Sequence, residues 1–331
     1  MGQRNTYVLP SELRRSIEKI SNVAHAYWVT RWQARWRTDK QDPVVSQYRA
    51  CGRQVQIRAG YVGMKGTALS TVQLNPSEES GYIFDNAAEE AESRFGSLAT
   101  IYDGVTFGHL RRRGKGPGWK CLEVGGGNGS IADWMSKQVG RNGQVVATDL
   151  DTRYLKLLNH PHVEIRTHDV VLDPLETDHF DLVHTRLVLI HVSDRAEALR
   201  RLVAATKPGG WVVFEEFDAT WMGEDILPTN AALQKAMKKR GGDPRYGREL
   251  PSKLKELGLL EVGNSGHVFQ WRGGSEYSRL LRANFDQVRD GIVEAGLVST
   301  EQFETDVARL NDPDLILPSP ILWSVWGRKP G

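Results

Sequence analysis

Residues 119–130 restrict the fold of this chain more than any other stretch. Their sequence, WKCLEVGGGNGS, begins with an apolar run that is typical of a buried strand and continues into a glycine-rich turn. Glycine lets the backbone turn sharply and approach a ligand without a Cβ in the way. Apolar residues then recur at helical spacing from Ile131 to Val139, and we expect Ser130 to cap that helix. A strand, a glycine turn and a helix start in this order present free helix N–H groups to a nucleotide.

One side chain separates the two kinds of nucleotide that such a loop binds. The dinucleotide pattern G-x-G-x-x-G needs a third glycine where this sequence has Ser130. Glu123, two residues before the first glycine, repels a pyrophosphate but suits an amine, and S-adenosylmethionine presents such an amine. A glycine loop that merely joins a strand to a helix is the alternative without a ligand.

Composition sets outer limits on what the chain can be. Its 331 residues, 40% hydrophobic and 25% charged, allow one large core with or without a smaller second domain. The formal net charge of +2 gives no whole-chain argument for nucleic-acid binding. Two cysteines, Cys51 and Cys121, predict neither a disulfide framework nor a metal cluster. Because apolar runs of transmembrane or signal-peptide type are lacking, we expect a cytoplasmic protein without a membrane partner.

Residues 1–63 differ from the rest of the chain, because they are rich in arginine and poor in acids. Trp28, Trp32 and Trp36 stand at helical spacing and form one stripe. Such a basic amphipathic helix suits a membrane surface, a nucleic acid or a protein partner, and docking on the protein's own body is the alternative. Since the segment shows no sustained periodicity after this stripe, we expect residues 1–63 to be poorly ordered or not native, with Met64 as the natural start.

Residues 64–110 precede the glycine strand and carry helical patterns, with Asp85 or Asn86 as the expected cap. A helix in this place has no partner except the ligand crevice or the flank of the sheet, so we expect a helical lid. Its candidate contact residues are Tyr82, Phe84 and Arg94. Plain packing is the alternative for the two aromatic side chains.

Strand patterns alternate with helical patterns after the glycine loop. The expected strands cover residues 144–149, 163–167, 180–186, 211–217 and 321–328. This alternation predicts a mainly parallel sheet with helices on its faces. Two amphipathic helices within residues 274–312 form an insertion, and we expect its Tyr277 and Phe285 to wall, with the lid, a pocket for an aromatic or multi-ring molecule.

Charged side chains gather where these strands end, at the edge where open α/β sheets bind ligands. Asp149 closes the second strand, where its carboxylate can accept both hydroxyl groups of a ribose. Glu215 and Glu216 alternate in direction, so at most one of them faces the pocket, and Glu216 is preferred. His184 and His191 flank the end of the fourth strand, where a neutral imidazole accepts a proton. A structural role is the alternative for each histidine.

The pattern E-x-G-x-G-x-G at residues 123–129 resembles motif I of the class I S-adenosylmethionine-dependent methyltransferases. The turn KPGG at residues 207–210, directly before the fifth strand, is a second mark of that family. The likeness runs from residue 80 to 328. Residues 82–86 and 215–218 make the chain similar, more narrowly, to bacterial small-molecule methyltransferases of the natural-product or quinone type.

The resemblance implies an α/β fold of the Rossmann-like kind within residues 111–331, with seven strands that are mostly parallel and a last strand that is antiparallel. The lid and the helical insertion are additions to this fold. The cofactor implied is S-adenosylmethionine, with its adenine amine on Asp169, an adenine face on Val170 and its carboxylate on Arg186. The implied cofactor-binding residues are Glu123, Gly125, Gly127, Gly129, Asp149, Leu150, His168, Asp169, Val170, Thr185 and Arg186.

The implied reaction moves a methyl group in line to an oxygen, nitrogen or carbon of a small, aromatic or multi-ring molecule. The candidate bases are His184, His191 and Glu216. Three alternatives stay open: an RNA or protein methyltransferase, an NAD-dependent oxidoreductase, and a S-adenosylmethionine-binding module without catalysis. The basic N-terminal segment is the one argument for RNA, and the sequence lacks the Asn-Pro-Pro-Tyr-like tetrad of adenine-modifying enzymes. Nothing in the sequence indicates an oligomeric state.

Overall fold

A computed structural model of the chain describes residues 44–50, 53–59, 72–73, 83–84, 90–113, 116–158, 160–219 and 226–331. The chain divides into two compact units, of which the second comprises residues 49–53 and 74–331. A separate three-stranded sheet, most of it in the first unit, has the order β1-β2-β3. Its strands are β1 (Val44–Ala50), β2 (Arg53–Ala59) and β3 (Val72–Gln73).

Strands β1 and β2 therefore lie in a segment for which the sequence indicates no sustained periodicity. The tryptophan stripe of Trp28, Trp32 and Trp36 lies outside the described residues. The boundary at residue 63 and the start at Met64 stay predictions.

The second unit is built on a seven-stranded sheet with the order β6-β5-β4-β7-β8-β12-β9. The strands are β4 (Lys120–Val124), β5 (Gln144–Asp149), β6 (Val163–Thr167), β7 (Phe180–Arg186), β8 (Thr206–Asp218), β9 (Leu260–His267) and β12 (Ile321–Arg328). Strands β4 to β8 pair in parallel, whereas β12 is antiparallel to both β8 and β9. The predicted fold class is confirmed, including the antiparallel last strand.

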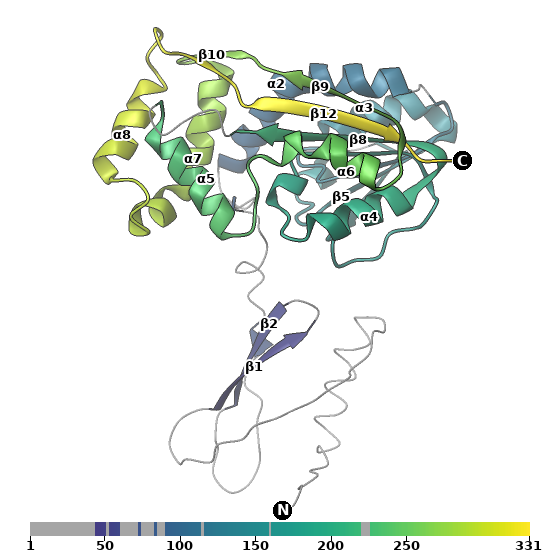
Figure 1. The fold of residues 1–331 in the computed structure, drawn as a ribbon, viewed down its shortest axis with the longest axis horizontal. Helices are drawn as coiled ribbons and strands as arrows, with labels where there is room; N and C mark the ends of the chain where they lie inside the picture. Colours follow the sequence, from purple (N-terminus) through teal and green to yellow (C-terminus); the bar gives the residue numbers. More distant parts are fainter. Residues whose placement is uncertain are drawn as a thin grey trace, which may run out of the picture. The chain divides into compact units, whose positions relative to one another are not determined.

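Helices cover both faces of the sheet and form an insertion at one end (Figure 1). The helices are α2 (Glu90–Arg113), α3 (Ser130–Val139), α4 (Arg195–Ala205), α5 (Pro228–Lys239), α6 (Leu250–Glu256), α7 (Glu276–Glu294) and α8 (Thr300–Arg309). Short 3-10 turns occur at Gly140–Asn142, Leu155–Leu157, Leu189–His191 and Tyr246–Arg248. Two further short strands, β10 (Gln270–Arg272) and β11 (Ile316–Pro318), pair antiparallel beside α7.

The alternation of side chains along the strands gives each face its own core. Leu122 and Val124 of β4 belong to the cluster that contains α4 and α6. Cys121 of β4 and Val145 of β5 belong to the cluster that α3 and the last turns of α2 cover. Figure 1 shows the same division, with α2 and α3 on one side of the sheet and α4 and α6 on the other.

The lid region contains one continuous helix where the sequence suggests a helical pair. Helix α2 has 24 residues and passes through Gly104 and Gly108 without a break. Glycine weakens an exposed helix by roughly 1 kcal/mol per residue. Here the apolar side chains of Tyr102 and Leu110 are buried against the rest of the unit, and this packing outweighs the propensity of the two glycines.

Two other local predictions need correction. Helix α3 begins at Ser130, but its cap is Gly129, with φ of 83° and no side-chain hydrogen bond, so Ser130 is not the cap. The sequence also predicts a helix at residues 154–158, but the structure has only a 3-10 turn there, Leu155–Leu157.

None of the helices in the described part of the chain has the length and apolarity that a bilayer crossing requires. The same residues contain no group of three or more His, Cys, Asp or Glu side chains placed to hold a metal ion.

Asp306 of α8 joins two helices of the insertion, and we predict that its loss destabilises the second unit. Its Oδ2 accepts the N–H of Thr229 in the first turn of α5 at 2.8 Å, and the side chain is fully buried. Asp306→Ala leaves this helix N–H without a partner, which costs about 1–3 kcal/mol. Chemical denaturation measures the loss, and the exposed Asp290→Ala is the matched control with no expected change. Equal midpoints for the two variants would contradict the prediction.

Candidate functional site

The glycine loop turns at the carboxyl end of β4, between β5 and β7. Gly125, Gly127 and Gly129 have positive φ values of 71°, 53° and 83°, a region that residues with a Cβ rarely adopt. The Gly125 N–H donates to the carbonyl oxygen of Thr148 at 2.8 Å, which ties the loop to β5. A Cβ added at Gly125 would lie 2.1 Å from Cγ2 of Val188, so no larger residue fits this place.

Asp149 closes β5 and faces the glycine loop rather than solvent. Its Oδ2 accepts the N–H of Gly127 at 3.0 Å, and its Oδ1 accepts the N–H of Asp151 at 3.1 Å. Burial raises the pKa of Asp149, and these N–H groups work against the rise. Leu150, the next residue, exposes 52% of its surface, which leaves an apolar side chain open to a ligand.

The residues predicted to line an adenine follow β6. Asp169 Oδ1 accepts the N–H groups of Val171 and Leu172 at 2.8 and 3.2 Å, so this carboxylate shapes the turn. Val170 and His168 are buried on either side of it, and burial lowers the pKa of His168. The three predicted residues are therefore close together at the end of β6, at the same sheet edge as Asp149.

Glu123 and His184 meet because β4 pairs with β7 in a register that sets one opposite the other. His184 Nδ1 donates to Glu123 Oε2 at 2.5 Å, and the two residues are buried, with 0% of His184 and 1% of Glu123 exposed. His184 Nε2 lies 3.5 Å from Oε2 of Glu215, a charge contact rather than a well-formed hydrogen bond. Glu215 also accepts hydrogen bonds from Ser324 Oγ at 2.6 Å and from Thr106 Oγ1.

These contacts decide which groups carry charge. Burial opposes the charged form of His184, but the charge of Glu123 and its hydrogen bond, together with Glu215, raise the pKa of His184 to about 9. Burial also opposes the charged form of Glu215, yet the close contact with His184 and its positive charge lower the pKa of Glu215 to about 2. His184 is thus an imidazolium at neutral pH and has no lone pair with which to act as a base. This charge state does not favour the predicted role of His184 as a base.

Arg186, predicted to hold the cofactor carboxylate, is engaged by α2. Its Nη2 donates to Asp103 Oδ1 and its Nη1 to Thr106 Oγ1, each at 2.9 Å. The guanidinium therefore ties α2 to the end of β7. Thr185 is fully buried, and its Oγ1 has no hydrogen-bond partner among the described residues. A ligand that bonded this hydroxyl would remove a desolvation cost.

Glu216 points to the opposite face from Glu215, as strand alternation predicts, and shapes the chain after β7. Its carboxylate accepts the N–H groups of Val188, Leu189 and Ile190 at 3.0, 2.7 and 3.1 Å. Burial raises the pKa of Glu216 to about 8, although these three N–H groups work against the rise. The carboxylate that the sequence favours as a base is therefore committed to holding a loop.

His191 lies against the lid residues. Phe84 meets the His191 ring edge to face at 5.8 Å, and Arg94 Cζ lies 4.8 Å from the centroid of Phe84 and 4.7 Å from that of Phe95. Burial, with the charge of Arg94, lowers the pKa of His191 to about 3, so this imidazole is neutral at neutral pH. A Cβ added at Gly127 would lie 3.0 Å from Phe95, so the first turns of α2 cover the glycine loop.

The remaining predicted contact residues do not share one place. Tyr277 of α7 packs edge to face on Tyr102 of α2 at 6.1 Å, so it belongs to the contact between lid helix and insertion. Phe285 is buried in the core of the insertion, 6.4 Å from Phe303, and it serves packing because α7 turns that face toward α8. Tyr82 lies outside the described residues.

The sequence alone does not single out several residues that shape this edge of the sheet. They are Phe95, Asp103, Thr106 and Ser324. The sequence does contain one indication of the two α2 residues. Asp103 and Thr106 are three residues apart, so they place polar side chains on the same face of a helix that is otherwise largely apolar there. Ser324 carries no such signal, since its role depends on which strand lies next to β8.

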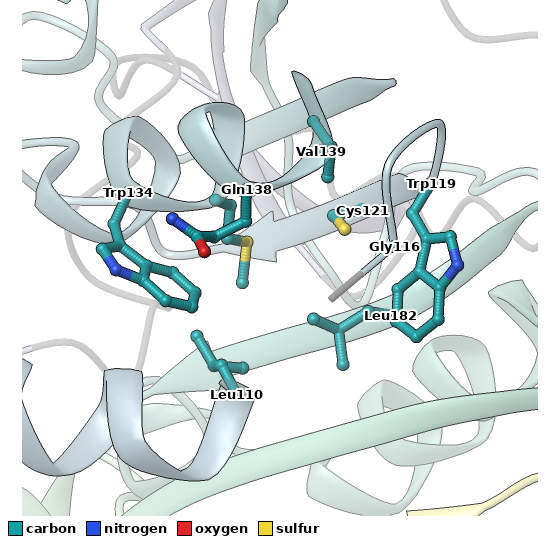
Figure 2. A pocket seen from close by; sticks show the side chains of 9 residues that line it. Leu110, Gly116, Trp119, Cys121, Trp134, Gln138, Val139 and Leu182 are labelled. Carbon is teal, nitrogen blue, oxygen red and sulfur yellow. The ribbon is translucent and has the colours of Figure 1, made fainter. Parts of the chain in front are cut away.

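A small apolar pocket lies elsewhere, where α2 and α3 cover the early part of β4 (Figure 2). Figure 2 shows Trp134 and Gln138 of α3 on one side of it and Leu110 of α2 on another. Cys121 also lines it, and burial raises the pKa of this thiol. Because Cys121 is at the start of β4 and the glycine loop is at its end, this pocket is not part of the candidate site.

A family model described as a methyltransferase domain matches residues 87–287. The methyltransferase str2 of Strobilurus tenacellus is 33% identical over 153 residues, which are 43% of this chain and 55% of that protein. The ubiquinone/menaquinone biosynthesis C-methyltransferase UbiE of Pseudomonas fluorescens is 31% identical over 234 residues, 64% of this chain and 87% of that protein. The chain spans about half the length of several other curated relatives it matches.

Among solved structures, phosphoethanolamine N-methyltransferase 2 of Haemonchus contortus aligns with a TM-score of 0.49 and 16% identity. The alignment covers 73% of this chain and 57% of that one.

Glu216 is expected to stabilise the loop after β7, and Glu216→Gln tests this. The amide keeps the volume but offers one acceptor oxygen, so at least one of the three N–H groups faces an NH2 group. We predict a loss of about 1–3 kcal/mol in the free energy of unfolding, measured by denaturant titration. The exposed Glu256→Gln, which affects only a pair with Lys253, is the control and should change little. A Glu216→Gln protein as stable as wild type would refute the prediction.

Proposed function

The chain belongs to the methyltransferase domain family, and from this premise we propose that it transfers a methyl group from S-adenosylmethionine to a small molecule. Membership confirms the predicted family and enzyme class and, with them, the cofactor. The acceptor, the atom that is methylated and the residues that act on them are the proposal.

One observation carries the proposal: the glycine loop has a carboxylate on either side. Glu123 stands in β4 directly before the loop, and Asp149 at the end of β5 accepts a hydrogen bond from it. The positive φ values and the tight contact at Gly125 leave a backbone surface that a ligand can approach closely. Leu150 adds an exposed apolar side chain and Thr185 an unsatisfied hydroxyl at the same edge. A nucleoside with an amino-acid tail fits this donor and acceptor set.

The residues divide the cofactor between them in the proposed function. Asp149 accepts the ribose hydroxyls, and Leu150 with Val170 covers the adenine faces. Glu123 takes the ammonium group. The cofactor itself supplies a methyl group already activated on a positive sulfur, so the protein contributes chiefly alignment and exclusion of water. Phe95 and the first turns of α2, which cover the glycine loop, serve that exclusion.

The acceptor is proposed to be a small aromatic or multi-ring molecule that binds between α2 and the insertion. The relative named as a ubiquinone/menaquinone C-methyltransferase favours a quinone-type acceptor and a carbon target over oxygen or nitrogen.

His191 is the proposed base where the acceptor group must lose a proton. Of the three candidate bases, His184 is an imidazolium and Glu216 holds a loop. His191 is neutral, follows β7 and lies against Phe84 of the lid region. Because burial and Arg94 lower its pKa, this imidazole accepts a proton only when the acceptor group becomes an anion beside it and stabilises the imidazolium.

Incubation of the protein with S-adenosylmethionine and a panel of phenols, quinols and N-heteroaromatic compounds tests the proposed function. We expect at least one compound to gain the mass of one CH2 unit, detected by mass spectrometry, and fragmentation of that product identifies the methylated atom. A gain confined to RNA or to protein substrates would replace the small-molecule acceptor. Binding of NADH without binding of S-adenosylmethionine, measured by calorimetry, would overturn the proposal.

Asp149→Asn should weaken the binding of S-adenosylhomocysteine about tenfold, since a hydrogen bond to a charged acceptor contributes about 1.5–3 kcal/mol. Titration calorimetry measures the change. The matched control is Asp151→Asn, two residues on, whose carboxylate pairs with Arg153 at the surface. The control should bind like wild type. Equal affinities for all three proteins would place the ribose elsewhere.

A further inference from the structure

A buried line of charged and polar groups runs from β4 to α2 beneath the glycine loop. It begins at Glu123, continues through His184 to Glu215, and from Glu215 reaches Thr106 of α2. Arg186 closes a parallel connection, since it bonds both Thr106 and Asp103. The carboxylate proposed to bind the cofactor ammonium is therefore linked to the helix that covers the loop.

The line carries an excess of negative charge. Three carboxylates, those of Glu123, Glu215 and Asp103, stand against two cations, His184 and Arg186, so one negative charge lacks a partner within this group. Burying an uncompensated charge is costly. Burial raises the pKa of Glu123 even though His184 opposes the rise. The cost of the unpaired negative charge therefore falls on this carboxylate, which lies next to the glycine loop. An ammonium group bound at the loop would supply the missing positive charge.

We propose that His184 is a positioning residue, which fixes the Glu123 carboxylate for the ammonium group of the cofactor and connects it through Glu215 to α2. The inference rests on the proposed function, because it needs S-adenosylmethionine or its product at the glycine loop. It excludes proton transfer by His184, since Nδ1 donates to Glu123 and Nε2 faces Glu215. His184 touches neither the acceptor nor the methyl group in this arrangement.

Two substitutions separate the contacts of the imidazole. The amide of asparagine can replace the Nδ1 donor that faces Glu123, whereas the longer glutamine places its amide near Nε2, which faces Glu215. Both His184→Asn and His184→Gln remove the positive charge, so the difference between them compares the contact with Glu123, which asparagine keeps, with the contact with Glu215, which glutamine keeps. We expect His184→Gln to bind S-adenosylhomocysteine about tenfold more weakly than His184→Asn, measured by calorimetry.

The pH dependence of the affinity for S-adenosylhomocysteine gives a second test, since a purely structural role of His184 would leave it unchanged. His184 has a raised pKa, so its charge is complete well below pH 9 and is lost as the pH rises through about 9. The groups that face it are Glu123 of β4, Glu215 of β8, Arg186 of β7, Thr106 of α2 and Ser324 of β12. His109 of α2, which also senses Glu215, has a pKa lowered to about 4 by burial and stays neutral in this range.

Loss of the His184 charge leaves a second unpaired negative charge beside Glu123, which attracts the ammonium group of the ligand. Because this ammonium group titrates equally in both proteins, the affinity of wild type for S-adenosylhomocysteine should fall less steeply than that of His184→Asn as the pH rises through about 9. Equal affinities of the Asn and Gln variants, with pH profiles parallel to wild type, would overturn the positioning role. If His184→Gln does not fold, the comparison of wild type with His184→Asn across pH decides. A wild-type protein that fails to bind S-adenosylhomocysteine would instead refute the proposed function itself.

Discussion

The parallel pairing of β4 with β5 on one side and β7 on the other is the constraint on which the site depends. The pairing with β5 brings the Thr148 carbonyl to the N–H of Gly125 and sets Asp149 beside the loop. The pairing with β7 sets Glu123 opposite His184. A shift of one residue in either register would turn these side chains to the other face of the sheet. The geometry of the candidate site is thus a consequence of strand register.

Burying the charged groups at this edge costs free energy of folding. Removing an ion from water is expensive, and an ion pair repays this only when its partners are complete. Here the pairs between His184 and its two neighbouring carboxylates leave one negative charge over. A cation that enters the site gains from this arrangement, whereas a pyrophosphate is repelled by it. The same electrostatics that argue for a sulfonium cofactor with an ammonium tail therefore argue against NAD.

The sequence predicts best those features that depend on residues close together in the chain. The glycine loop, Asp149 and six strands of the central sheet, β4 to β8 and β12, follow from short apolar runs and from glycine, which act within a few residues. The cap at Ser130 was wrong because Gly129, in the left-handed region, already ends the turn. Such a backbone state leaves no mark in the sequence beyond the presence of glycine.

Contacts between residues far apart in the sequence could not be predicted from the sequence alone. The partner of His184 is 61 residues away, and only the strand order brings the two together. Glu216 was correctly placed on the other face from Glu215, but its three N–H partners come from a loop whose path has no sequence signature. The helical spacing that includes Phe285 is the same whether its side chain lines a pocket or lies in a core. Only its packing against Phe303 of α8 shows that it belongs to the core of the insertion.

A crystal structure of the protein with S-adenosylhomocysteine tests the central claim most directly. The account predicts the ribose hydroxyls within hydrogen-bond distance of Asp149 and the ammonium group beside Glu123, with the hydrogen bond from His184 to Glu123 retained. A ligand bound away from the glycine loop, or an ammonium group that leaves Glu123 unpaired, would contradict it.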